Sequence, residues 1–167
     1  VFINGKSVSK DDVRGMVAIC PQFNSHLCMD MTPDEHFKLY SMLAELSPYE
    51  TMDRINTILN ILELGSYRDR LVGEMSGGQQ RRLAVALSFF GDADIILLDE
   101  PTSSLDPYSR HKVHNLIKHF QGTKTFMLCT HLLGEVEALC DNISIMSRGN
   151  VFTCGSPQYL TAKFGTE

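Results

Sequence analysis

Residues 75–80 read MSGGQQ, and residues 94–101 read DIILLDEP. The second stretch is a run of apolar residues that ends in two adjacent carboxylates, Asp99 and Glu100. A short apolar run of this kind is typical of a strand buried inside a parallel sheet. The first stretch places Ser76 and two glycines directly ahead of an apolar pattern at helical spacing, which predicts the start of a helix. The two stretches together predict an α/β fold.

Strands and helices alternate through the second half of the chain. We predict strands at residues 94–98, 125–129, 143–147 and 151–154, with helices beginning at Pro107 and Leu132. This alternation predicts a parallel sheet covered on both faces by helices. A further buried strand is predicted at residues 13–20, ahead of Pro21.

Residues 32–90 are expected to be helical throughout and to form a layer separate from the sheet. Residues 32–35 (TPDE) predict a helix start, because proline suits the first helical position and an acid three residues after threonine completes a capping box. The apolar residues of this helix recur at helical spacing at Phe37, Tyr40, Leu43 and Leu46. A second helix is predicted from about residue 49 to residue 64, with Gly65 as its stop.

Composition places the chain among ordinary globular domains. It has 167 residues, 43% of them hydrophobic, which suits one domain with a substantial core. The net charge of −5 disfavours a broad basic face for nucleic acid. No apolar stretch approaches the ~18–20 residues needed to cross a bilayer. The five cysteines form no CxxC pair, so we interpret them as reduced, buried thiols rather than metal ligands.

The serine and glycines of the first stretch suit a phosphate group. The first backbone N–H groups of a helix have no partner inside it and lie at the positive end of its dipole. Gly77 and Gly78 would let phosphate oxygens approach the backbone, and Ser76 adds a hydroxyl donor. Alone, such a turn is more often an ordinary serine cap. Gln79 and the acidic residues downstream favour the phosphate interpretation.

The acidic pair suits metal-assisted hydrolysis. Asp99 ends its predicted strand at the sheet edge where ligands bind in parallel sheets, and a carboxylate there can hold Mg²⁺. Glu100 is placed to act as a general base on an attacking water. An Asp-Glu pair ahead of Pro101 is also a common polar turn, and that alternative stays open on these residues alone.

Three further residues have weaker individual signals. Asp106 precedes Pro107 and would cap a helix, which explains it adequately. His131 follows a strand end, where a neutral imidazole can hydrogen-bond a γ-phosphate. Gln22 follows the first buried strand and can offer its amide oxygen to Mg²⁺. The remaining histidines are expected in loops or on polar helix faces without a catalytic role: His26, His36, His111, His114 and His119.

In combination these residues resemble the nucleotide-binding domain of ATP-binding cassette (ABC) proteins. The matching stretches are the Q-loop at residues 20–22, the signature at 75–79 with methionine for the usual leucine, Walker B at 94–100, the D-loop at 103–106 and the switch histidine at 130–131. The resemblance implies a P-loop NTPase-like parallel sheet flanked by helices, with an inserted helical subdomain. It divides the chain into a core strand and Q-loop (1–24), a helical signature subdomain (25–90) and the core from Walker B onward (91–167).

The resemblance also implies an ATPase that uses ATP and Mg²⁺. It assigns Gln22 and Asp99 to magnesium, Glu100 to water activation and His131 to the γ-phosphate. Asp106 would act across a dimer. The turn of Ser76, Gly77, Gly78 and Gln79 would bind the ATP of a second cassette arranged head to tail.

Two stretches resemble the A subfamily in particular: residues 20–22 (CPQ) with 31–37 (MTPDEHF), and residues 155–166 (GSPQYLTAKFGT). Members are large eukaryotic membrane proteins with two cassettes, and most move lipids. This implies transmembrane domains as partners, a place on the cytosolic face of a membrane, and no nucleic acid. A soluble cassette ATPase serving translation or repair and an inactive truncated cassette are the alternatives.

The sequence departs from the family in one respect: it contains no G-x-x-x-x-G-K-[ST] loop, whose backbone and lysine cradle phosphates. In the family this loop precedes the Q-loop by several dozen residues. We therefore expect that the chain, which begins with an apolar strand and turn at residues 1–5, is cut from a longer protein. We expect the segment alone neither to bind ATP tightly nor to fold stably.

Overall fold

The computed structural model describes residues 2–3, 5–9, 13 and 15–165, which form two compact units divided between Cys129 and Thr130. Two short strands, β1 (Phe2–Ile3) and β2 (Lys6–Ser7), pair antiparallel near the N-terminus, as the predicted strand and turn require. Val1 and Asn4 of that prediction, and Thr166 of the subfamily-like ending, lie outside the described residues.

The first unit is built on a three-stranded parallel sheet in the order β3 (Val17–Cys20), β4 (Ile95–Asp99) and β5 (Thr125–Cys129). The parallel sheet predicted from the sequence is thus confirmed. Of the strand predicted at 13–20, Arg14 lies outside the described residues, and the last four residues form β3. Met16 instead donates a backbone hydrogen bond to Val13, which closes a turn ahead of β3.

The segment between β3 and β4 is largely helical, but short loops interrupt the range 32–90, which was predicted to be helical throughout. It contains α1 (Pro33–Leu43), α2 (Pro48–Ile61), the 3-10 turns η1 (Gly65–Tyr67) and η2 (Val72–Glu74), and α3 (Gly77–Phe90). Capping boxes at Thr32 and Ser47 start α1 and α2, each with proline at the first helical position. The stop predicted for α2 at Gly65 is wrong: Glu63 already adopts a left-handed φ of 52°, so the helix ends before it.

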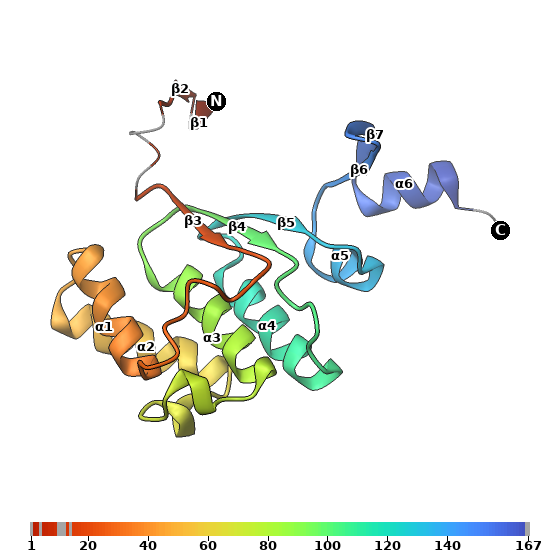
Figure 1. Cartoon of the computed structure of the whole chain (residues 1–167). Coiled ribbons are helices and arrows are strands. Elements are labelled where there is room, and N and C mark those ends of the chain that lie inside the picture. Colours follow the sequence, from red (N-terminus) through yellow and green to blue (C-terminus); the bar gives the residue numbers. More distant parts are fainter. Residues whose placement is uncertain (1, 4, 10–12, 14, 166–167) are drawn as a thin grey trace. The chain divides into compact units, whose positions relative to one another are not determined.

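Helix α3 is the central element of this unit. All ten residues of α3 from Arg81 to Phe90 are buried. The buried surface of this helix is therefore larger than the single apolar stripe predicted from the sequence. It packs against β3, α1, α2 and α4 (Pro107–Phe120), and Figure 1 shows it between the α1–α2 pair and α4. A helix apolar on nearly every side must be enclosed, since no face is left for water.

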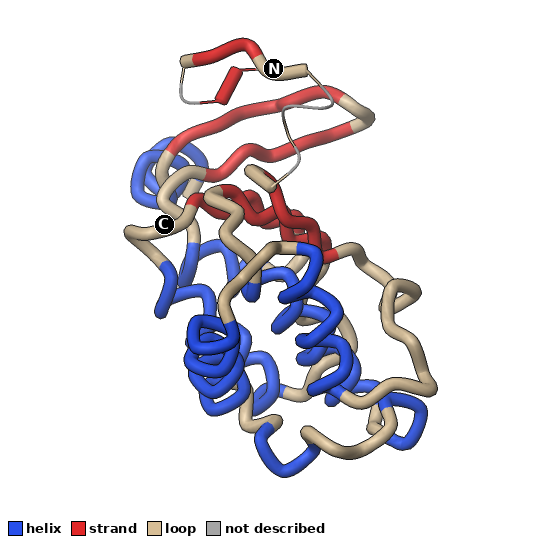
Figure 2. The backbone as a smooth tube through the Cα atoms, turned by 90° about the vertical axis from the view of Figure 1, so that its left-hand side faces the viewer, coloured by secondary structure: helices blue, strands red, loops and turns tan. Residues whose placement is uncertain are grey.

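Helices of the first unit cover one face of the sheet. Phe89 of α3 stacks on Phe126 of β5 with ring centroids 5.5 Å apart. Successive side chains of a strand point to opposite faces of the sheet. Ile19 and Met127 are both in register with Leu97, which lies between them, so they share one face. Each of the two is 62% exposed. The prediction that helices cover both faces is therefore not met within this unit. Figure 2 shows its helices gathered on the same side of the strands.

The second unit contains α5 (Leu133–Leu139), β6 (Ile143–Ser147), β7 (Asn150–Gly155) and α6 (Pro157–Phe164). The predicted strands are present, but β6 pairs antiparallel with β7 and joins no parallel sheet within the described residues. Arg148 and Gly149 both have positive φ, at 49° and 80°, which is the geometry of a tight hairpin turn. In the part of the chain that the structure describes, no helix is long and apolar enough to cross a membrane.

The cysteines are all free, as predicted, but their expected burial is wrong in most cases. Cys20 is buried, and burial raises the pKa of its thiol. Cys28, Cys129 and Cys154 are exposed, because they occupy a loop, a strand end and a hairpin strand rather than the core.

Phe37 and Leu43 lay on one predicted stripe of α1, yet the structure separates them. Phe37 is 0% exposed and packs edge-on against Phe90 at 5.1 Å, whereas Leu43 is 75% exposed. We expect Phe37→Ala to lower the free energy of unfolding by about 3–5 kcal/mol. Leu43→Ala should change it by less than about 0.5 kcal/mol. Urea unfolding of the two variants, each made in the complete protein, tests this, and equal midpoints would contradict the packing described.

Candidate functional site

The carboxyl edge of the sheet brings three of the predicted site residues to one place. Cys20 pairs in register with Leu98, so the chain leaves β3 and β4 at the same edge, where parallel sheets bind ligands. Gln22 follows β3, Asp99 ends β4 and Glu100 comes next. Gln22 and Asp99 are exposed and Glu100 is half-buried.

Glu100 occupies a strained turn. Its φ of 47° is left-handed, which costs a non-glycine residue roughly 1–2 kcal/mol. Its backbone N–H donates to the carbonyl of Cys129 at 2.8 Å, and its own carbonyl accepts from Ser103 N–H at 3.0 Å. Both sides of the residue are therefore fixed, and strain of this kind is concentrated at functional sites.

The predicted phosphate turn is the N-terminus of α3. Ser76 is the N-cap: its hydroxyl oxygen accepts from Gln79 N–H at 3.3 Å, and its N–H donates to Gln79 Oε1 at 2.8 Å. Gln80 Nε2 donates to the carbonyls of Val72 and Met75, which anchors the chain ahead of the cap. The turn is therefore held rigid from both sides.

The two glycines of this turn are not required by the chain's own fold. Neither has a positive φ; a Cβ on Gly77 would meet nothing within 4 Å, and one on Gly78 would make an ordinary 3.6 Å contact with Leu105. Helices α1, α2, α4 and α6 begin with proline, which has no N–H, whereas α3 begins with glycine and keeps its amide. The first turn of α3 thus presents bare backbone amides at the positive end of a helix, which suits an anion.

The loop after Glu100 comes close to this turn, since the Leu105 side chain lies 3.6 Å from where a Cβ on Gly78 would stand. Asp106 ends the loop and caps α4, accepting from Ser109 N–H at 2.9 Å. Hydrogen bonds from the Ser109 side chain and backbone hold the pKa of the Asp106 carboxyl below its usual range, so it is ionised at neutral pH. The predicted cap is present, and the loop that comes close to the α3 turn ends in a negative charge.

His131 belongs to the second unit, where it is exposed. The turn that carries it is ordered by Thr130, whose hydroxyl donates to Glu135 Oε2 at 2.7 Å and accepts from Leu132 N–H at 3.1 Å. Its assignment to the γ-phosphate stays a prediction.

Among the other histidines, His36 contradicts its predicted place on a polar helix face. It is 2% exposed; Nε2 lies 2.9 Å from the Cys28 amide and Nδ1 lies 2.9 Å from the Thr32 carbonyl. An amide can only donate, so Nε2 accepts and Nδ1 donates, and the ring is a neutral structural tie. His26 is half-buried, and burial together with the charge of Arg81 lowers its pKa.

The donor set at the sheet edge fits magnesium. The metal prefers oxygen ligands and usually keeps several waters while binding one or two carboxylates and a substrate phosphate. The exposed carboxylate of Asp99 and the amide oxygen of Gln22 are ligands of this kind. Within the described residues, no group of three or more His, Cys, Asp or Glu side chains is arranged to hold a metal ion. Waters and a substrate phosphate would have to complete the ligands of the ion.

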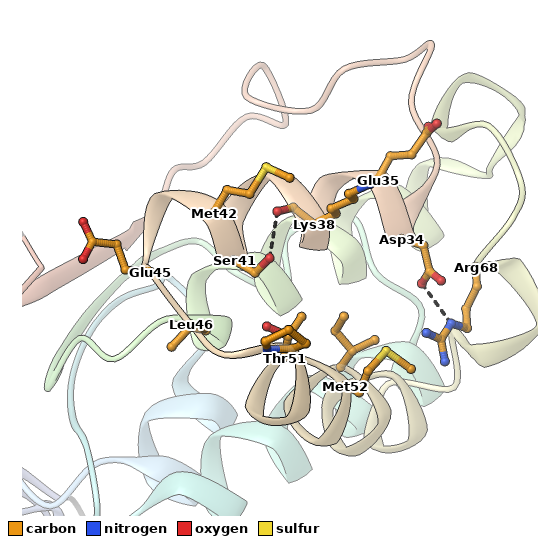
Figure 3. A pocket seen from close by; sticks show the side chains of 12 residues that line it. Asp34, Glu35, Lys38, Ser41, Met42, Glu45, Leu46, Thr51, Met52 and Arg68 are labelled. Atoms are coloured by element: carbon orange, nitrogen blue, oxygen red, sulfur yellow. Dashed lines mark hydrogen bonds and ion pairs between the residues drawn. The ribbon is translucent and has the colours of Figure 1, made fainter.

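Away from this edge, the helical segment contains a cavity of about 660 Å³ between α1 and α2. Figure 3 shows Asp34 and Arg68 joined by an ion pair at one end of it, with the two side chains 2.8 Å apart. Met42 and Met52 line its walls and are 65% and 49% exposed. It contains no predicted nucleotide-site residue.

One residue at the site received no role from the sequence. Arg81 follows the signature by two positions, is 4% exposed, and donates to the loops after β3 and β4. The sequence contained a signal for such a role: two adjacent arginines precede the apolar helical residues 83–90. An arginine so close to a buried helix is buried only if hydrogen-bond acceptors satisfy its N–H groups.

The fold and the residues at the sheet edge are those expected of a nucleotide-binding domain, and comparison with known proteins shows the family. Residues 1–103 match the family described as ABC transporter, so the chain belongs to that family. It is 37% identical over 155 residues to ATP-binding cassette sub-family A member 2 of Rattus norvegicus, covering 93% of this chain and 6% of that protein. It is 36% identical over 168 residues to the retinal-specific phospholipid-transporting ATPase of Homo sapiens, covering 99% and 7%.

The chain therefore spans a small part of these relatives' length, and the resemblance to the A subfamily is confirmed. Among solved structures, an ATP-binding subunit of an ABC transporter matches with a TM-score of 0.85 and 25% identity, over 98% of this chain and 69% of that one. The cbiO1 protein of Clostridium perfringens matches in fold, with a TM-score of 0.81 and 23% identity over 97% of this chain and 67% of that one.

Proposed function

We propose that this chain is part of a cassette that binds and hydrolyses ATP to power transport across a membrane. The observation that carries the proposal is the pairing of two features in a member of the ABC transporter family. One is a bare, open helix start at Gly77 and Gly78; the other is a carboxylate pair at the edge of a parallel sheet.

Within the cassette, Gln22 and Asp99 would hold Mg²⁺ through their side-chain oxygens, and Glu100 would accept the proton of the attacking water. When bound, the ion supplies positive charge against the phosphate oxygens. His131 would hydrogen-bond the terminal phosphate. The fixed backbone of Glu100 supports its role, since a base held in one orientation needs no reorganisation during reaction.

The turn of Ser76, Gly77, Gly78 and Gln79 would bind the ATP of a second cassette, arranged head to tail. Its exposure and the absence of any intrachain need for glycine support a ligand from outside. Asp106, which is ionised and ends the loop that comes close to the turn, would act across the same interface.

The transported substrate is proposed to be a lipid, and the cassette to lie on the cytosolic face of a membrane. A relative matching 99% of this chain is named as a phospholipid-transporting ATPase. The transmembrane domains of the transporter would contact the helical segment, where α1 and α2 expose Leu39, Met42 and Met52. The A-subfamily relatives favour this over a soluble ATPase.

Glu100→Gln tests the hydrolytic step. The substitution keeps the size of the side chain and one acceptor oxygen but removes its charge and basicity. We expect ATP turnover by the complete transporter to fall about a hundredfold or more, with ATP binding retained. Glu137→Gln, the same change at an exposed glutamate of α5, should leave turnover unchanged. Phosphate release measures both, and wild-type turnover in the Glu100 variant would refute the proposal.

Gly77→Ala separates folding from binding. The added methyl meets open space, and alanine favours a helix by up to about 1 kcal/mol over glycine, so stability should hold or rise. Hydrolysis should be lost, because the methyl would stand where a phosphate approaches the amide. Gly134→Ala is the matched control, since Gly134 lies in the first turn of α5 and also has open space. Normal ATP turnover in the Gly77 variant would show that the turn contacts no phosphate.

We propose further that a polypeptide of residues 1–167 alone hydrolyses no ATP. Its sequence contains no lysine-bearing glycine-rich loop, and Ile19 and Met127 of its sheet are exposed. Purified polypeptide should show no phosphate release and weak ATP retention in equilibrium dialysis. A measurable rate that Glu100→Gln abolishes would overturn this statement.

A further inference from the structure

The guanidinium of Arg81 satisfies all five of its N–H donors. Nε donates to the Pro101 carbonyl at 3.0 Å, and Nη2 donates to the carbonyls of Asp99 and Glu100 at 2.9 and 3.0 Å. Nη1 donates to the Pro21 carbonyl at 2.7 Å and to Asn24 Oδ1 at 3.2 Å. One side chain therefore binds the segments that leave two neighbouring strands.

These acceptors are neutral groups, and the side chain is 4% exposed. Moving a cation from water into a site lined by neutral carbonyls costs free energy. Replacing buried charged residues with apolar ones often leaves the stability of a protein unchanged or raises it. Stability alone is therefore a weak explanation for an arginine here. Its rigid planar fork fixes the relative positions of several groups at once, which a lysine with three rotatable donors cannot do.

The groups that Arg81 fixes are those on either side of the proposed chemistry. Two of its bonds fall on Pro21 and Asn24, which flank Gln22 in the chain. Three fall on consecutive carbonyls from Asp99 to Pro101, around the left-handed turn at Glu100. Because Arg81 lies in α3, these loops are also tied to the helix that begins at Ser76.

We propose that Arg81 is a positioning residue for ATP hydrolysis: it holds the Gln22 loop and the Asp99–Glu100 turn in fixed register with the signature helix. This inference rests on the function proposed above. Helix α3 would contact the nucleotide of the second cassette, whereas Asp99 and Glu100 would act on the nucleotide of their own cassette. Through Arg81, each cassette would therefore couple the two nucleotide sites that the pair of cassettes forms.

The neighbouring Arg82 is a matched control within the same helix. It is also buried, at 9% exposed, but its Nη1 donates to the Leu62 carbonyl at 2.6 Å, in the segment that follows α2. Arg82 thus ties α3 to the helical segment and reaches no site loop. Replacing either arginine with lysine keeps the charge and removes the fork.

The test measures ATP turnover, KM for ATP, the Mg²⁺ concentration for half-maximal activity and the unfolding temperature. It uses the complete transporter with Arg81→Lys, Arg82→Lys or Glu100→Gln. We expect Arg81→Lys to lower turnover about tenfold or more and to raise the Mg²⁺ requirement severalfold, because small displacements of reacting groups are costly. Arg82→Lys should lower the unfolding temperature but leave turnover per folded molecule within about twofold, since its bond ends away from the site.

Equal turnover per folded molecule in the two lysine variants would overturn the inference. Asn24→Ala serves if Arg81→Lys does not fold: it removes one acceptor from the Gln22 side, and it should raise the Mg²⁺ requirement without lowering the unfolding temperature. An unchanged Mg²⁺ requirement in that variant would also overturn it. Glu100→Gln distinguishes the two proposals. Wild-type ATP turnover in Glu100→Gln would refute the proposed function. Loss of turnover in Glu100→Gln together with wild-type turnover in Arg81→Lys would refute only the role of Arg81.

Discussion

The structure of the first unit depends on the burial of α3 along its length, with its first turn left partly open. Every residue from Arg81 to Phe90 is enclosed by the sheet and three helices, whereas Ser76 and Gly77 are exposed. A close-packed helix of this kind has no freedom to slide, because displacement would open voids along its whole surface. The exposed turn is therefore as firmly placed as the core, although it makes few contacts of its own.

Half-buried cations complete this arrangement by donating hydrogen bonds to backbone carbonyls at the C-terminal end of α3 and just beyond it. Arg54 Nη1 donates to the Phe90 carbonyl at the end of α3, and Lys124 Nζ donates to the carbonyls of Gly91 and Ala93 just beyond it. Burial lowers the pKa of Lys124, the expected sign for an ammonium removed from water. Positive charge at the C-terminal end of α3 also complements its dipole. Arg81 uses the same chemistry at strand ends, where the carbonyls belong to the site.

Local chemistry explains how much of this could be predicted from the sequence. Caps at Thr32, Ser76 and Asp106 and the strand at 125–129 depend on neighbouring residues, and each was predicted at or within a residue of its place. The site residues at the sheet edge followed from the rule that parallel strands end together. The failures share another cause: the burial of His36, the exposure of Leu43 and the antiparallel pairing of β6 depend on distant partners. Arg81 is the clearest case, since its acceptors lie about 20 residues later and about 60 residues earlier in the chain.

Backbone strain separates the site from the rest of the fold. Among the non-glycine residues that the structure describes, left-handed φ values occur besides Glu100 at Glu45, Glu63, Ser104 and Arg148. Glu45 and Glu63 follow helix ends and Arg148 lies in a hairpin, positions where glycine or asparagine would remove strain. At Glu100 that remedy would delete the carboxylate. The strain there is instead offset by hydrogen bonds on both sides of its backbone: its N–H donates to the Cys129 carbonyl, and its carbonyl accepts from Arg81 Nη2. A glutamate that is held in a strained backbone conformation by these hydrogen bonds fits the catalytic role proposed for Glu100 better than a role in stability.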